Sequence, residues 1–318
     1  MGSNTIFYLA LPARTALKGG VLDPTANKGE SISGIKNDIN IRTALLFLMV
    51  SLFAVFLGCQ NDESNEPDTP NVPNTPEGWT LLRSDEFDYS GPPNPDKLVY
   101  ENGILRNEEA QYYTPRPENV EVTEGCLVIT ARKENYEGAA YTSASVNTKG
   151  RFSFQGGRIE VRARLPEGRG VWPAIWTLGI NTDDPNVAWT SCGEIDIMEF
   201  VGYEGDTVYC TVHTRDYGQF TGKGRGGWIK TEWPFDDFHI YALEWYDDRM
   251  EFYFDDTNYF TCHRKGEGFG EWPFDFPHYL LINLAIGGTW GGLEGIDDAI
   301  FPVKYRIDYV RIFGSATL

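Results

Sequence analysis

Three carboxylates lie close together in the apolar segment SCGEIDIMEFVG. They are Glu194, Asp196 and Glu199, and every residue between them is apolar. Placing like charges on one partly buried strand is costly, because each carboxylate loses hydration and the three repel one another. A strand that only supports a fold has no use for this arrangement, so the pattern indicates a functional site.

The spacing of these carboxylates also predicts an irregular strand. In a regular strand the side chains at 194, 196 and 198 share one face, so Glu199 would point to the opposite face. If all three carboxylates work together, an extra residue at Ile197 and Met198 must form a β-bulge that returns Glu199 to the face of the other two.

The chemistry that suits such a cluster is glycoside hydrolysis. Two carboxylates about 5–5.5 Å apart are the apparatus of a retaining glycosidase. One is a nucleophile that must stay ionised, and the other is a general acid that must hold its proton near neutral pH. A third carboxyl between them, Asp196, would share a proton with the nucleophile. The sequence has no G-x-S-x-G elbow, no P-loop and no H-E-x-x-H motif that would indicate a competing chemistry.

The elements that position these carboxylates are expected to be β-strands. Short runs with period-2 alternation, rich in β-branched and aromatic residues, recur between turn residues. They span residues 126–133, 157–165, 194–200, 206–214, 238–246, 250–256, 279–288 and 305–313. No stretch shows sustained helical periodicity. The fold class is therefore all-β, and residues 78–318 are enough for a large sandwich of two sheets.

Composition excludes several classes of partner. The chain has 318 residues, with 27 Lys and Arg against 46 Asp and Glu, and a net charge of −19. Nucleic acids and polyanionic glycans need a basic groove, so both are disfavoured. Aromatic residues reach 14% and must fill a core or face a ligand.

The cysteines after residue 59 are expected to be buried rather than bridged, and no Cys/His cluster has zinc-like spacing.

The N-terminal part of the chain is predicted to be a targeting segment. Residues 44–58 form an apolar run of 15 residues, which is shorter than the roughly 20 that a membrane-spanning helix needs. Lys36 and Arg42 precede the run and a small residue ends it, as in a secretory signal. An uncleaved membrane anchor is the alternative.

The run FLGC resembles a bacterial lipobox, which predicts lipidation of Cys59. Residues 1–58 are then an N-terminal extension and signal peptide, 59–77 a disordered acidic and Pro-rich tether, and 78–318 the catalytic domain. The acidic residues after Cys59 resemble the surface-export signal of Bacteroidetes lipoproteins. We therefore expect an extracytoplasmic protein, lipid-anchored at the outer membrane on the cell surface.

Several motifs together resemble one enzyme family. The segments GEIDIMEF, GVWPAIWTLG (170–179) and NLAIGGTWGG (283–292) closely resemble family 16 glycoside hydrolases of the laminarinase-like branch, and the resemblance extends from Trp79 to the C-terminus. It implies a concanavalin-like β-jelly roll of two antiparallel sheets with a concave substrate cleft. By matched position it implies Glu194 as nucleophile, Asp196 as assisting carboxylate and Glu199 as acid/base.

The resemblance also implies residues that contact the substrate or a metal. Aromatic rings pack on the apolar faces of sugars, and a core role is the alternative for each aromatic residue. The implied substrate contacts are Asn107, Trp172, Trp176, His213 and Trp290. Catalysis is expected to need no cofactor. A structural Ca²⁺ is implied at the carboxylate of Asp308 with the backbone carbonyls of Glu86 and Gly125, an all-oxygen set that suits this ion.

Three functions from different classes remain open from the sequence. The leading one is an endo-acting retaining hydrolase of β-1,3-glucan or mixed-linkage β-1,3/1,4-glucan. The second is a hydrolase of β-galactan, of the agarase or carrageenase type, on the same scaffold. The third is a non-catalytic, glycan-binding surface lipoprotein, which would have no need of all three carboxylates. Nothing in the sequence demands more than a monomer.

Overall fold

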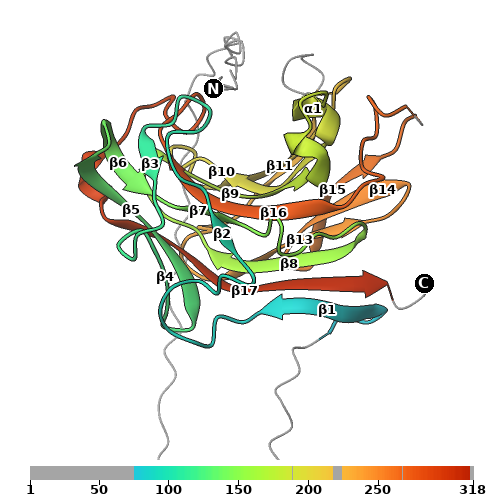
Figure 1. Cartoon of the computed structure of the whole chain (residues 1–318), viewed down its shortest axis with the longest axis horizontal. Helices are drawn as coiled ribbons and strands as arrows, with labels where there is room; N and C mark the ends of the chain where they lie inside the picture. The colour runs from blue at the N-terminus through green and yellow to red at the C-terminus, as the bar shows by residue number, and fades with distance from the viewer. Residues whose placement is uncertain (1–74, 188, 218–223, 267, 316–318) are drawn as a thin grey trace, which may run out of the picture. The chain divides into compact units, whose positions relative to one another are not determined.

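The computed structural model describes residues 75–187, 189–217, 224–266 and 268–315, which form two stacked β-sheets (Figure 1). The predicted all-β sandwich is confirmed, and each of the eight predicted runs overlaps a strand. The predicted signal peptide, Cys59 and most of the predicted tether lie outside the described residues. Among the described residues, no helix is long and apolar enough to cross a membrane.

The sheet that carries the carboxylates has seven strands in the order β12-β11-β10-β9-β16-β7-β2, and all neighbours are antiparallel. In chain order these strands are β2 (Val99–Tyr100), β7 (Ser145–Asn147), β9 (Val171–Gly179), β10 (Glu194–Phe200), β11 (Thr207–His213), β12 (Arg225–Lys230) and β16 (His278–Ile286).

The second sheet has ten strands and packs against the inner face of the first. Its strands are β1 (Trp79–Asp85), β3 (Gln111–Tyr113), β4 (Val120–Thr123), β5 (Cys126–Tyr136), β6 (Ala139–Ser143), β8 (Gly157–Arg164), β13 (His239–Trp245), β14 (Arg249–Phe254), β15 (Thr257–His263) and β17 (Val303–Ser315). Short helical turns occur at η1 (Ile180–Asp183), α1 (Trp189–Cys192) and η3 (Asp298–Ile300). Figure 1 shows α1 among the loops that rise beyond β9, β10 and β11.

Strands β9 and β16 are buried on both faces. All nine residues of each strand are buried, so neither shows the alternation of a half-exposed strand. In β9, Val171 and Ile175 face the core between the sheets, whereas Trp172 and Trp176 belong to clusters on the opposite face. The outer face of the seven-stranded sheet is therefore covered as well, and it carries large aromatic rings.

Strand β10 contains the predicted bulge. On the β11 side Asp196 pairs with Thr211 and Glu199 with Tyr209, so three residue steps on β10 match two on β11. On the β9 side the register shifts between Asp196 and Met198. One extra residue is thus inserted in β10, and it returns Glu199 to the face of the other two carboxylates.

Met198 anchors this bulge in the core. The side chains of Ile197 and Met198 are consecutive in the sequence, yet both pack in the central hydrophobic cluster, and Met198 is fully buried. We predict that Met198→Ala lowers the free energy of unfolding by about 2–5 kcal/mol, because it leaves a cavity beside the bulge. Met198→Leu keeps the volume and should cost less than about 1.5 kcal/mol. Urea unfolding measures both, and equal stabilities of the two variants would contradict this role.

Candidate active site

A cavity of about 300 Å³ opens on the outer face of the seven-stranded sheet. All eight residues predicted from the sequence to be catalytic or to bind substrate line it. They are Asn107, Trp172, Trp176, Glu194, Asp196, Glu199, His213 and Trp290. The structure therefore brings together residues from three strands and two loops that are up to 183 positions apart in the sequence (290 − 107).

Strand register explains why the three carboxylates face the same cavity. Residues directly opposite each other on neighbouring strands share a face. Asp196 lies opposite Trp176 of β9, and Glu199 lies opposite Ala174 of the same strand. Because Ala174 and Trp176 are two residues apart, they share a face, and so do the two carboxylates that pair with them.

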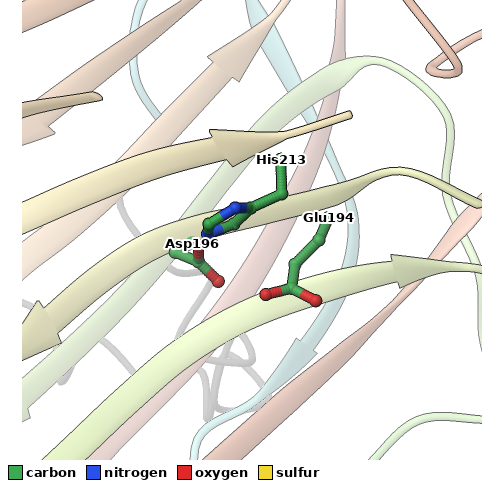
Figure 2. Close-up of side chains that lie close together, drawn as sticks. All are labelled: Glu194, Asp196 and His213. Atoms are coloured by element: carbon green, nitrogen blue, oxygen red, sulfur yellow. Dashed lines mark ion pairs between the residues drawn. The ribbon is translucent and has the colours of Figure 1, made fainter. Parts of the chain in front are cut away.

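Each carboxylate has a defined polar partner. The indole N–H of Trp189 donates to Glu194, and Trp172 Nε1 donates to Glu199 Oε1 at 3.2 Å. His213 Nε2 lies 3.0 Å from Asp196 Oδ2. Figure 2 shows His213 and Asp196 side by side, with the Glu194 carboxylate next to them.

The same cluster has the geometry of a small ligand set. Single ligand atoms of Glu194, Asp196 and His213 lie within 4.8 Å of one another, so among the described residues these three could hold a metal ion. Retaining hydrolysis uses the carboxylates directly, as nucleophile and proton carrier.

Burial changes the protonation of the three carboxyl groups. Desolvation raises the pKa of Glu194, Asp196 and Glu199 to about 8 each. The negative charge of Asp196 raises the pKa of the other two further, and the positive charge of His213 opposes this increase. At neutral pH the cluster therefore holds protons, because three adjacent buried charges are too unfavourable.

The partners of the carboxyls indicate where the protons lie. The Trp189 N–H stabilises the charged form of Glu194, so the proton that Glu194 and Asp196 share belongs on Asp196. Glu199 keeps its own proton because burial of its carboxyl disfavours the charged form. This gives one ionised and one protonated glutamate, the two states that the carboxyls of a retaining glycosidase need.

Trp176 is held in place by a polar network that was not predicted from the sequence. Its Nε1 donates to Asn283 Oδ1 at 2.8 Å, and Asn283 Nδ2 donates to the Tyr113 hydroxyl at 3.0 Å. That hydroxyl donates in turn to Glu109 Oε2 at 3.0 Å. The Arg106 guanidinium lies 5.0 Å from the centre of the Trp176 ring. The orientation of the indole is therefore fixed before any substrate binds.

Asn107 and Trp290 lie on two loops that are joined by a backbone hydrogen bond. The Thr289 N–H donates to the Asn107 carbonyl at 2.8 Å, and the Trp290 ring packs edge-on against Trp172 at 5.6 Å. The Asn107 side chain donates to Glu109 Oε1 at 3.3 Å.

Several residues that line the cavity were missed by sequence reasoning, among them Arg106, Glu109, Trp189 and Asn283. The first, second and fourth lie within or beside the motifs NEEAQYYT and NLAIGGTWGG, so the motifs were a usable signal. Trp189 lies five residues before Glu194 in the short helix α1, where no strand pattern could indicate that it donates to the Glu194 carboxylate.

The positions implied for calcium lie close together on the second sheet. Asp308 is the extra residue of a bulge in β17. On one side of it, Ile307 pairs with Leu127 of β5, which follows the turn at Gly125. On the other side, Val310 pairs with Asp85 at the end of β1, next to Glu86. The Asp308 carboxylate accepts a hydrogen bond from Arg162 at 2.6 Å. The guanidinium of Arg162 thus already pairs with the one carboxylate of the set, and the metal stays a prediction.

The cysteine prediction is confirmed within the described residues. Cys126, Cys192, Cys210 and Cys262 are buried and free. Burial raises the pKa of the Cys192 thiol to about 11, so this thiol stays protonated beside the carboxylates.

Comparisons with known proteins agree with this site. Residues 107–311 match the glycosyl hydrolases of family 16. A β-glucanase from Rhodothermus marinus is 44% identical over 273 residues, which cover 82% of this chain and 92% of the relative. The solved laminarinase from Rhodothermus marinus has a TM-score of 0.71 and 45% identity, covering 74% of this chain and 97% of its own.

A second solved structure carries a ligand. It is a mutant of a non-specific endo-β-1,3(4)-glucanase of family 16, co-crystallised with 1,3-β-D-cellotriosyl-glucose and presenting 1,3-β-D-cellobiosyl-glucose at its active site. Its TM-score is 0.71 and its identity is 39%, and the alignment covers 75% of this chain and 96% of that chain.

The raised pKa of Asp196 predicts how stability depends on pH. Its pKa is about 8 in the folded state and about 4 in the unfolded chain. Between these values the folded state binds more protons, so this residue's contribution to stability is present at low pH and is lost as the pH rises through 8. Asn cannot ionise, so the stability of Asp196→Asn relative to the native protein should increase by up to about 4 kcal/mol from pH 5 to pH 9.

Urea unfolding at pH 5, 7 and 9 measures this difference. Asp88→Asn is the matched control, because Asp88 is exposed and its substitution should give a difference that does not change with pH. A constant difference for Asp196→Asn as well would contradict the raised pKa.

Proposed function

The chain belongs to glycosyl hydrolase family 16, and we propose that it is an endo-acting retaining hydrolase of β-1,3-glucan and mixed-linkage β-1,3/1,4-glucan. The observation that carries this proposal is the bulge in β10, which directs Glu194 and Glu199 into one aromatic cavity. The similar β-glucanase, the laminarinase and the non-specific endo-β-1,3(4)-glucanase support the substrate class. A neutral polysaccharide also suits a cavity that is rich in Trp.

The geometry accounts for a double displacement. In the first step a carboxylate oxygen of Glu194 forms a bond to the anomeric carbon while the glycosidic C–O bond breaks, and Glu199 gives its proton to the departing oxygen. In the second step Glu199 removes a proton from water, the water oxygen bonds to the anomeric carbon, and the Glu194 carboxylate leaves. Both substitutions invert the anomeric carbon, so the β-configuration is retained.

Asp196 has a supporting role in both steps. When Glu194 becomes an ester it loses its negative charge, and Asp196 no longer needs to share a proton with it. The proton then stays on Asp196, beside His213, until the second step restores the Glu194 carboxylate.

Product analysis tests this function. We predict that the purified protein releases oligosaccharides from laminarin and mixed-linkage β-glucan but not from agarose. Glu194→Gln should lower the rate 10³-fold or more, about 4 kcal/mol of barrier, because an amide is a poor nucleophile. Glu121→Gln is the matched control, since Glu121 is an exposed residue of β4, and it should retain full activity. Release from agarose alone would indicate a galactan hydrolase, and binding without release from any of the three would indicate a glycan-binding protein.

We also propose that the protein is anchored by a lipid on Cys59 and acts outside the cytoplasm. The apolar run 44–58 with its upstream Lys36 and Arg42 supports this proposal. Metabolic labelling with a palmitate analogue in a bacterial host should label the native chain and should not label Cys59→Ala. Labelling of both proteins, or of neither, would contradict the anchor.

A further inference from the structure

The position of the catalytic pair fixes the direction in which a glucan chain must cross the sheet. This direction follows only if the proposed function is correct. The two carboxylates of a retaining glycosidase flank the bond that is broken, and here both belong to strand β10. The polysaccharide must therefore pass between Glu194 and Glu199, across β10 rather than along it. One arm of the chain then lies over β9 and β16, and the other lies over β11 and β12.

The first of these arms meets the aromatic and polar residues already described. Trp172 and Trp176 lie on β9, and Asn283 lies on β16. The other arm extends over strands on which sequence analysis indicated only His213. A long polysaccharide needs a surface on that side as well, because an endo-acting enzyme binds its substrate on both sides of the broken bond.

Trp228 is positioned to supply that surface. It lies on β12, the edge strand of the sheet, directly opposite Tyr209 of β11, and Tyr209 lies opposite Glu199 of β10. Opposite residues share a face, so Trp228 is on the face of the catalytic carboxylates. A side chain at the neighbouring Gly227 would instead meet Phe260 of the other sheet. Side chains of β12 therefore alternate between the core face and the face of the carboxylates, and Trp228 is on the latter. The Trp228 side chain is 58% exposed.

Aromatic contacts connect the cavity to this strand. The Trp290 ring packs against Trp172 at 5.6 Å and against Tyr209 at 5.1 Å, edge-on in both cases. Tyr209 is the cross-strand neighbour of Trp228. Ring contacts therefore link Trp172, Trp290 and Tyr209 along the Glu199 side of the cleft, and the next position across the sheet is the exposed indole of Trp228. A single exposed apolar residue is ordinary on a protein surface, but one that continues the aromatic lining of a cleft is placed to bind the same ligand.

We propose that Trp228 is an outer sugar-binding platform, on which a ring of the β-glucan chain stacks beyond the catalytic strand. Two strand spacings of about 4.8 Å separate β12 from β10, so the platform lies about 10 Å from the broken bond. A sugar next to that bond does not reach it. Trp228 thus contributes to binding of long glucans and contributes nothing to short substrates.

The test compares a long and a short substrate in the full chain. On laminarin, Trp228→Ala should lower kcat/KM about tenfold, mostly through KM, because the stacking of one ring is lost. On para-nitrophenyl β-laminaribioside, which is too short to reach β12, kcat/KM should stay within about twofold of the native value. Trp228→Phe keeps an aromatic ring and should recover most of the activity on laminarin.

Trp233→Ala is the matched control. Trp233 is equally exposed, at 58%, but it lies in the loop after β12 and has no pairing partner in the described strand β11 that would place it on the face of the carboxylates, so its substitution should leave both substrates unaffected. Unchanged activity of Trp228→Ala on laminarin, or an equal loss on both substrates, would overturn the platform. A native protein that cuts no β-glucan would instead contradict the proposed function, whatever the Trp228 variant does.

Discussion

The single extra residue in strand β10 determines the arrangement of the rest of the site. Without the bulge, the period of two in a strand would place Glu199 in the core, on the opposite face from Glu194 and Asp196. With the bulge, Met198 takes the core position and Glu199 turns into the cavity. The bulge also places Glu199 opposite Tyr209, so it sets which aromatic residues border the acid/base side of the cleft. A feature of the backbone thus decides which side chains can react and which surface the substrate meets beside them.

The burial of three adjacent carboxyls lowers the stability of the folded state. Three buried carboxyls that face one cavity would be strongly unfavourable if all were charged, and burial instead raises the pKa of each to about 8. The protein uses this penalty, because a buried carboxyl that keeps its proton at neutral pH is a general acid. The Trp189 and Trp172 N–H groups and His213 give each of the three carboxyls its own polar partner. The aromatic walls therefore have two functions: they exclude water, and they donate hydrogen bonds to Glu194 and Glu199.

The parts of this account that follow a local rule could be predicted from the sequence. Alternating runs indicated the strands, and the spacing of Glu194, Asp196 and Glu199 required a bulge, whose position the structure confirms. The contribution of Trp189 could not be predicted, because it depends on how a four-residue helix folds back over β10. The position of Trp228 could not be predicted either. Its relation to Glu199 passes through two strand registers, and a shift of one residue in either register would place the indole in the core.

The most direct test of the central claim is to trap the intermediate. A 2-fluoro-2-deoxy-β-laminaribiosyl fluoride should react with the native protein and stop at the glycosyl-enzyme, because the fluorine at C2 slows the second step more than the first. Mass spectrometry of the digested protein should then find one added glycosyl group on the peptide that contains β10, and fragmentation should place it on Glu194. Attachment to Asp196 or Glu199, or an intact protein with no added mass after activity on laminarin has been shown, would contradict the assignment of roles that the bulged strand supports.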